Sequence, residues 1–537
     1  MKIRVAALCL LVLSSLISAR GQSHENYRTF LTQQVRSPKL PGPQHLRDYV
    51  HDGKLELSLH DAIVLTLENN SAIHVEEASV ETAKFSLLRT YQPFDPQLQS
   101  QYNATYNSTP NFGQIQGAGA SNATNQFFQA NFTQTLQTGT LVLLGFNNFN
   151  SVSKYLSTPL NYDQSFLNLQ ITQPLLRNRW LFENRAPLII ARKSLQQSRS
   201  SFEAQVSLAL QTAIGRYWAV VLAHGNLEVV QQSLDAAQAS YAHAKRALEL
   251  GALPPLDIYR SEATVASRRV QVLEAEYTLK QVEDDLRFTI GANQDEYVHA
   301  LDLDLTEKPE PLGELRTIDA GSALEEALLK RPEVQVAQRA LEKDDTSVRL
   351  AHNHLLPDLQ VSAQYTGSGF AGNGFSGTSI PGGLGTSLNQ LFTFGAPGYG
   401  ATVTLNLPIK NRAAQADLGL ALVTRHSDLY TMQQVREQIV LDVNTAVRQL
   451  EEAKLTLEAS KTALDLAQKT LAADQRKYEL GQETQDFFLL NSQTQVADAR
   501  QSLLQAQIGY QNAAANVDWA TGNMLATYQV QIADMMK

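Results

Sequence analysis

The 537-residue sequence has little charge, a single cysteine and, beyond residue 21, no apolar run that approaches 18 residues. Because a membrane-spanning helix needs about 20 largely apolar residues, we expect none in the body of the chain. Charged residues make up 18% of the sequence, and the formal net charge is −9. Binding to nucleic acid needs clustered Lys and Arg to displace counterions, so this acidic balance argues against a nucleic-acid partner.

The first residues have the pattern of an export signal. Basic side chains precede an apolar run at 5–17, and residues 19–21 offer a small-x-small cleavage site. About 13 apolar residues are too few to cross a bilayer, so we expect cleavage rather than anchoring. The single cysteine, Cys9, would leave with the signal, and Leu8 before it does not fit a lipoprotein. The mature chain then has no disulfide, thiol nucleophile or cysteine ligand.

Short motifs occur twice in the same order, which predicts an internal duplication. Each half begins with a helix-start signature and closes on a glycine. The matching motifs are Ser58-x-x-Asp61 with Ser322-x-x-Glu325, Pro96-Gln97-Leu98 with Pro357-Asp358-Leu359, Leu248-Glu249-Leu250-Gly251 with Tyr478-Glu479-Leu480-Gly481, and Gly291 with Gly522.

Strict alternation of apolar and uncharged polar side chains predicts two strands in each half. The segments lie at about 97–107 and 164–174, and at about 358–366 and 399–408. Alternating segments of about ten residues are typical of outer-membrane β-barrels. The alternative is a soluble antiparallel sheet with one wet face. The export signal and the long loops between the strands favour the barrel.

Four strands cannot close a barrel, so copies of the chain must combine, and three copies would supply twelve strands. Segment 126–150 also alternates, with Phe128, Ala130 and Phe132 leading to a turn at Thr138-Gly139, in the first half only. We expect four strands per chain and place this extra hairpin outside the membrane. The alternatives are that it folds over the mouth of the barrel or adds strands.

Long helices fill most of the remaining sequence. Runs at about 186–250 and 413–480 are each about 65 residues, or roughly 95–100 Å at 1.5 Å per residue. Each ends at a glycine and is followed by a second helix, at about 256–290 and 487–520, as in a helical hairpin. Shorter helices are predicted at about 60–92 and 322–355.

The sequence therefore predicts an α+β membrane protein. Its expected segments are a signal peptide at 1–21, an N-terminal extension at 22–56, a first repeat at 57–293, an acidic linker at 294–317, a second repeat at 318–523 and a tail at 524–537.

The repeated order of these motifs resembles the TolC family of outer-membrane efflux proteins (outer membrane factors). The resemblance implies a homotrimer with a 12-stranded barrel in outer-membrane lipid and a helical barrel that extends into the periplasm. It also implies an exit duct for an inner-membrane transporter, in a tripartite efflux pump or a type I secretion system. A periplasmic adaptor (membrane fusion) protein would dock at the hairpin tips, here Leu250, Gly251, Ala252, Leu480, Gly481 and Gln482.

The resemblance also places a periplasmic gate at these tips. Asp257 stands at the family's Asp position and Tyr478 at its Tyr position, but Glu483 stands where an Arg is expected. A charged lock is therefore at best partial in this chain. The simpler interpretation of Asp257 is an acid in the first turn of a helix, where the helix dipole favours it.

Catalytic signatures are absent from the sequence. It has no Gly-x-Ser-x-Gly, phosphate-binding loop or His-Glu-x-x-His motif, and His352 and His354 would lie on different faces of a helix. We expect no enzyme, metal site or cofactor. The alternatives to a duct are a membrane-anchored helical stalk without transport and a general diffusion porin, which the excess of helix disfavours.

Overall fold

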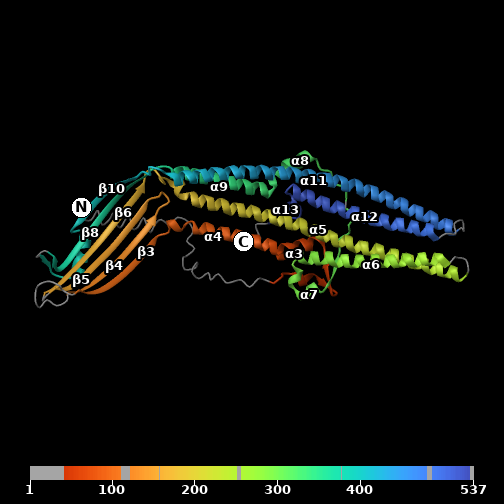
Figure 1. Ribbon diagram of the computed structural model, residues 1–537, viewed down its shortest axis with the longest axis horizontal. Coiled ribbons are helices and arrows are strands. Elements are labelled where there is room, and N and C mark those ends of the chain that lie inside the picture. Colours follow the sequence, from red (N-terminus) through yellow and green to blue (C-terminus); the bar gives the residue numbers. More distant parts are fainter. Residues whose placement is uncertain are drawn as a thin grey trace.

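The computed structural model describes residues 42–109, 121–155, 158–250, 255–311, 313–375, 378–479 and 486–531. The predicted signal peptide and most of the N-terminal extension lie outside these ranges. The molecule is elongated, with a β-sheet at one end and long helices that run from the sheet to the opposite end (Figure 1).

Helices follow one another in the same order in both halves of the chain. Two short helices precede the strands, and a long helix and a shorter partner follow them. In the first half these are α3 (Leu59–Asn69), α4 (Ser71–Arg89), α5 (Leu181–Glu249) and α6 (Pro255–Thr289); in the second they are α8 (Ala320–Lys330), α9 (Pro332–His354), α11 (Arg412–Glu479) and α12 (Asp486–Ala520). With 69 and 68 residues, α5 and α11 are each about 100 Å long.

Two predicted helices are broken, which corrects the expected continuous helices at 60–92 and 322–355. Asn70 ends α3, and its side chain accepts a hydrogen bond from the Ala72 amide (2.9 Å) at the start of α4. At the second break Arg331 is extended, because the ring of Pro332 disfavours a helical residue before it. The start of the helix predicted at about 186–250 also shifts, since α5 begins at Leu181 and runs through Pro187.

The glycines that close the two halves pack against these breaks. Gly291 and Gly522 have left-handed backbones, with φ of 75° and 77°. A Cβ on Gly291 would lie 2.6 Å from the Asn69 Cβ, and one on Gly522 would lie 3.1 Å from the Lys330 Cβ. Glycine is therefore required at both positions by conformation and by close approach.

The large sheet contradicts the prediction of four strands per chain. In the described part of the chain, six long antiparallel strands follow the order β10-β8-β6-β5-β4-β3, and the short β9 (Thr378–Ile380) pairs with the end of β8. Their bounds are β3 (Gln97–Thr109), β4 (Ser121–Thr135), β5 (Leu141–Tyr155), β6 (Thr158–Pro174), β8 (Asp358–Phe375) and β10 (Pro397–Asn406). The extra hairpin, β4–β5, lies inside this sheet between β3 and β6. Alternation shows which side chains share a face, but not which strands are neighbours.

The N-terminal extension and the linker form a small three-stranded sheet. Strands β1 (Val50–His51) and β2 (Lys54–Leu57) are antiparallel, and β2 pairs in parallel with β7 (Asp302–Leu305) from the linker. Short helical turns surround this sheet: η1 (Leu46–Tyr49), η3 (Ala292–Gln294) and α7 (Glu296–His299). Farther along the linker, the Arg316 guanidinium binds both oxygens of Asp518 at 2.9–3.0 Å. The linker is thus attached to both halves.

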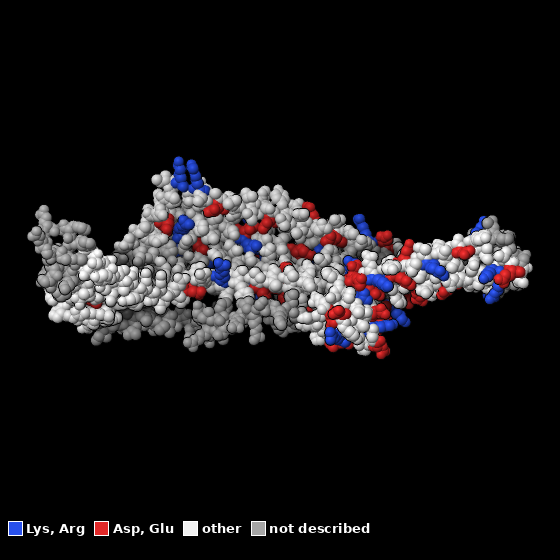
Figure 2. Space-filling view, turned by 60° about the horizontal axis from the view of Figure 1, so that its bottom comes forward, with Lys and Arg blue, Asp and Glu red and all other residues white. Residues whose placement is uncertain are grey.

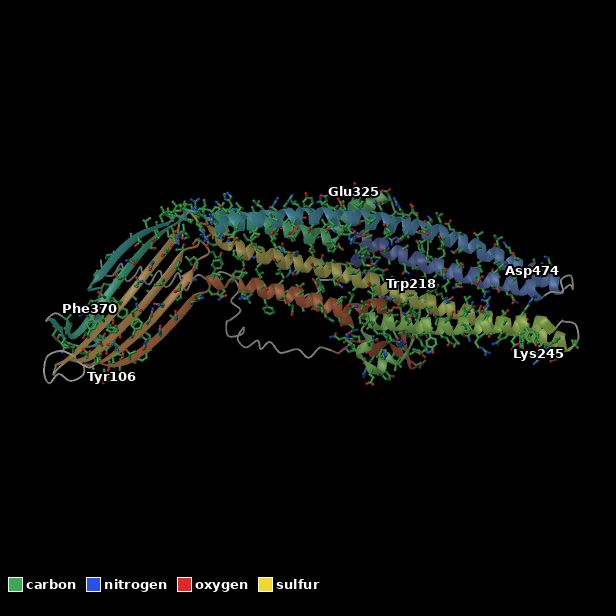
Figure 3. The ribbon with its side chains drawn as sticks, in the orientation of Figure 1. Tyr106, Trp218, Lys245, Glu325, Phe370 and Asp474 are labelled. Carbon is green, nitrogen blue, oxygen red and sulfur yellow. The ribbon has the colours of Figure 1, made fainter. Side chains whose placement is uncertain are left out.

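Two hydrophobic clusters hold the helices together, one around α3, α5 and α6 and the other around α8, α9, α11 and α12. Within α5, Leu181–Arg246 is apolar and long enough to cross a membrane, the one such helix in the described residues. Yet Phe202, Leu210 and Tyr217 of this helix are fully buried in the first cluster. We therefore interpret α5 as a core helix, with Trp218 near the middle of the shaft (Figure 3).

Candidate functional site

One face of the large sheet carries a continuous apolar band. Side chains on the same face of neighbouring strands are directly paired across all six strands. One complete row is Leu98, Phe132, Leu144, Leu169, Tyr365 and Tyr399. Such a band is what lipid-facing strands require.

The opposite face is polar but almost uncharged. The neighbouring row on that face is Gln99, Asn131, Gly145, Asn168, Thr366 and Gly398. The six strands carry only three charged residues, and of these only Asp358 stands on the polar face. Lys154 and Asp163 stand on the other face, beyond the apolar row, where the Asp163 carboxylate accepts hydrogen bonds from Asn148 (3.0 Å) and Asn150 (3.1 Å). On the face in Figure 2, charged side chains gather along the helical part and the sheet is nearly free of them. An apolar face opposite a polar one suits a wall between lipid and water.

The outer edges of this sheet, β3 and β10, have no partner strand among the described residues. Every residue of β3 is exposed, and Tyr399 and Val403 of β10 are 78% and 68% exposed. An open strand edge cannot lie in lipid, where unpaired backbone N–H and C=O groups cost several kcal/mol each. The sheet of one chain is therefore open at both edges and needs further strands before it can lie in lipid.

A short helix, α10 (Leu384–Phe392), covers the end of β8 that extends beyond β10. The Ser387 hydroxyl donates to the Gly369 carbonyl oxygen (2.9 Å), and the Phe370 amide donates to Gln390 Oε1 (3.0 Å). A Cβ on Gly369 would collide with the Ser387 backbone, so glycine permits this approach. The helix protects an edge that would otherwise be open.

The helices lie side by side in the order α6, α5, α12 and α11 (Figure 1), and the two outer ones expose apolar stripes. On α11 the side chains recur at intervals of 7, 11 and 14 residues, which places them on one side of the helix. They are Val423, Tyr430, Leu441, Leu455 and Leu466 on α11 and Val270, Leu273, Tyr277 and Phe288 on α6. Apolar stripes of this length are typical of a surface that packs against a partner.

The two helical hairpins end at the same end of the molecule (Figure 1). Of the predicted docking residues, Leu250 ends α5 and is 85% exposed, whereas Gly251, Ala252, Leu480, Gly481 and Gln482 lie outside the described residues, as does Glu483. Asp257 is in the first turn of α6 and Tyr478 in the last turn of α11, but their side chains are outside the description. The gate and the docking tips stay predictions.

Asp474 marks a contact near the second tip that the sequence did not indicate (Figure 3). Its carboxylate accepts a hydrogen bond from the buried hydroxyl of Ser492 (2.5 Å), which joins α11 to α12. Acidic and hydroxyl residues are common on helices, so only the packing of the hairpin identifies this pair.

Comparison with known proteins decides the family. Residues 147–292 and 323–523, more than half of the chain, match the outer membrane efflux protein family. This chain belongs to that family. Both the family and its outer-membrane setting, predicted from the sequence, are thereby confirmed.

Individual relatives of this outer membrane efflux protein are distant in sequence. The probable outer membrane lipoprotein SilC of Salmonella typhimurium is 23% identical over 293 residues, which cover 54% of this chain and 57% of SilC. The outer-membrane channel OprN has a TM-score of 0.62 at 14% identity, over 87% of this chain and 90% of OprN. The Campylobacter jejuni CmeC outer membrane channel has a TM-score of 0.61 at 15% identity, over 91% of this chain and 90% of CmeC. These structures share the fold.

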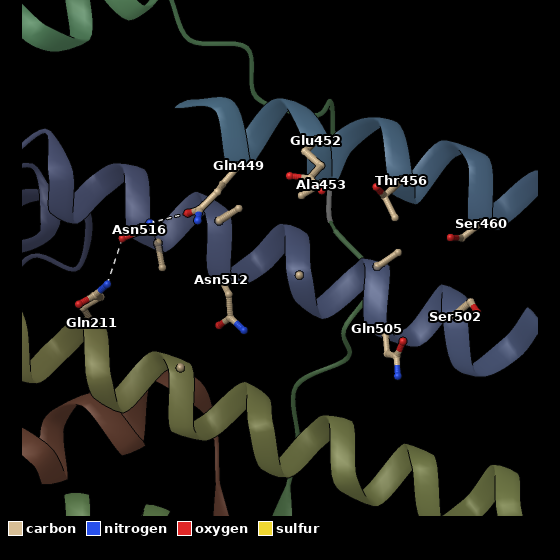
Figure 4. Close-up of a pocket in the computed structure, with 15 residues that line it drawn as sticks. Gln211, Gln449, Glu452, Ala453, Thr456, Ser460, Ser502, Gln505, Asn512 and Asn516 are labelled. Carbon is tan, nitrogen blue, oxygen red and sulfur yellow. Dashed lines mark hydrogen bonds between the residues drawn. The ribbon is translucent and has the colours of Figure 1, made fainter. Parts of the chain in front are cut away.

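A groove of this family member lies between α5, α11 and α12 (Figure 4). Gln211 donates to Asn516, which donates to Gln449, each at 3.0 Å. Glu452 is the one titratable residue among the fifteen that line the groove. In the described residues no group of three His, Cys, Asp or Glu side chains could hold a metal ion. Members of the family are channels, and this polar groove suits a water-facing wall.

Proposed function

We propose that three copies of this chain form the exit duct of a tripartite efflux pump or a type I secretion system. The observation that supports this proposal is a sheet with one apolar face, one polar face and two unpaired edges, which continues into hairpins about 100 Å long. In this arrangement the sheet crosses the outer membrane and the helices extend into the periplasm.

The trimer is supported by the surfaces that a single chain leaves uncovered. Strand β3 of one copy would pair with β10 of the next and complete the ladder that lipid demands. The stripe on α6 would pack against the stripe on α11 of its neighbour, because these helices lie at opposite ends of the helix order. Both contacts repeat around the same axis, as a closed ring requires.

At the far end of the duct, we propose docking of a periplasmic adaptor at the two hairpin tips, since both hairpins end at the same end of the molecule. The proposed contacts are Leu250, Gly251, Ala252, Leu480, Gly481 and Gln482, with Asp257 and Tyr478 as gate residues and Glu483 at the position expected for Arg. An inner-membrane transporter would deliver the substrate through the adaptor. The equal helix order of the two halves also supports our proposal that the chain is an internal duplication.

Native mass measurement of the mature protein, extracted in mild detergent, tests the assembly. A mass of three chains supports the shared barrel, whereas a folded monomer contradicts it. Conductance in planar bilayers then separates the duct from the alternative, a membrane-anchored stalk without transport. A trimer that does not conduct, even when the purified adaptor is added, would favour the stalk.

A further inference from the structure

We infer that hairpin β4–β5 is part of the membrane wall, so that three copies close an eighteen-stranded barrel. The inference rests on the proposed function, since it takes the trimer and the membrane position of the sheet from there. It concerns a hairpin that the sequence placed outside the membrane.

Both strands of this hairpin are paired along almost their whole length. The ladder between β3 and β4 runs from Gln97↔Thr133 to Thr109↔Ser121 without a break. The ladder between β5 and β6 runs from Leu141↔Thr172 to Tyr155↔Thr158. With β4 and β5 also paired to each other, the hairpin separates β3 from β6 completely.

The hairpin continues both faces of the wall. Phe132 and Leu144 stand in the apolar row between Leu98 and Leu169, and Asn131 stands in the polar row. At 15 residues each, β4 and β5 exceed the roughly 9–11 residues that a tilted strand needs to cross a bilayer. A hairpin outside the membrane would have no need for an apolar face in register with its neighbours.

The turn of the hairpin is fixed to the helical end of the sheet. Thr140 donates a hydrogen bond to Gln173 at the end of β6, and Arg185 at the start of α5 donates to Gln137. Gly139 turns with a φ of 82°, and a Cβ there would lie 2.8 Å from the Asn178 carbonyl oxygen. Strands that start from this end run the full height of the sheet.

Strand number sets the bore of the barrel. With strands about 4.8 Å apart and tilted by about 40°, eighteen strands give a diameter of about 36 Å between backbones, against about 24 Å for twelve. The outer mouth would then pass bulkier solutes than a twelve-stranded ring of the same family.

Single-cysteine labelling tests the position of the hairpin, because the mature chain is expected to contain no other cysteine. We would place Phe132→Cys and Leu144→Cys on the apolar face and Asn131→Cys and Asn147→Cys on the polar face. Leu169→Cys and Asn168→Cys in β6 are matched controls, since Leu169 stands in the row of Phe132 and Leu144 and Asn168 stands in the row of Asn131. Trimers in lipid nanodiscs would be treated with a charged, water-soluble maleimide.

We expect Cys at 131, 147 and 168 to react and Cys at 132, 144 and 169 to be shielded by lipid, with labelling at least about tenfold slower. Rapid labelling at 132 and 144 with continued shielding at 169 would place the hairpin outside the bilayer and overturn the inference alone. Rapid labelling at 169 as well would contradict the membrane sheet, and with it the proposed function.

Discussion

At the scale of single residues, the most perturbed acid outside the sheet is Asp344 on α9. It is 8% exposed, and burial together with the nearby carboxylate of Asp428 on α11 raises its pKa from 3.8 to about 6. The folded chain thus holds this proton more tightly than the unfolded chain. The contribution of Asp344 to stability is complete below pH 3.8 and is lost as the pH rises through about 6.

Asp344→Asn should therefore stabilise the protein at pH 8, by on the order of 1–3 kcal/mol per chain, and leave it unchanged at pH 4. Thermal unfolding of the detergent-solubilised protein at the two pH values measures this. Asp345→Asn is the control, because Asp345 is exposed and pairs with Arg425 at 2.6 Å. A lower melting temperature for Asp344→Asn at pH 8 would contradict the assignment.

The closing glycines give a second prediction. Gly291→Ala and Gly522→Ala should each destabilise the chain by about 1–2 kcal/mol, since Ala is strained at positive φ and its Cβ meets the helix breaks. Gly419→Ala is the opposite control: its helical site in α11 is open, so Ala should stabilise by about 0.5–1 kcal/mol. Equal effects at all three sites would mean that the left-handed conformations are not required.

The gate hypothesis is testable at Asp257 in the first turn of α6. If its carboxylate holds the tips closed, Asp257→Ala should raise single-channel conductance severalfold by releasing that contact. Glu262→Ala, an exposed acid on the same helix, is the control for the loss of one charge. Unchanged conductance in both variants would leave Asp257 with its simpler role at a helix N-terminus.

At the scale of elements, the small sheet links regions that are distant in the sequence. Leu55 and Leu57 of β2 are fully buried, and β2 pairs with β7 of the linker. We expect Leu57→Ala to cost about 2–5 kcal/mol and to expose the linker to trypsin at Lys308 and Arg316. Glu56→Ala, exposed in the same strand, should change neither the melting temperature nor the cleavage. If both variants resisted trypsin, contacts other than the pairing of β2 with β7 would hold the linker.

Element prediction succeeded where local chemistry decides the structure. The cap at Ser58, the glycines after α6 and α12 and the alternation in β3 were readable because they act within a few residues. The predicted cap at Ser322 was wrong, because α8 begins earlier and Asp319 is its cap, with a carboxylate that accepts from the Ser322 amide. The ring of Pro332 is a local signal for a helix break, but the helical periodicity on both sides of it led to the prediction of one continuous helix. The position of β4–β5 was not readable, because every strand of this sheet has the same alternation and any order would satisfy it. Pairing of β2 with β7 joins residues about 250 apart, which no local pattern indicates.

At the scale of the whole molecule, the sheet and the shaft should set different size limits. A neutral polymer added on the extracellular side should enter the wide mouth and lower the conductance. We expect this for polymers with a coil diameter up to the free bore of an eighteen-stranded ring. That bore is roughly 25 Å once the side chains are subtracted from the backbone diameter. From the periplasmic side the same polymers should be excluded at smaller sizes, because the proposed gate at the tips would narrow the path. Equal cut-offs from both sides would contradict a mouth wider than the shaft.

The position of the extra hairpin separates two properties of the barrel. A hairpin adds one outward and one inward strand, so β3 and β10 keep their directions and the seam between subunits is unchanged. Enlargement of the ring can therefore proceed only in steps of two strands per chain, or six per trimer. An exchange of this one segment between relatives would change the bore without redesign of the seam, the shaft or the tips.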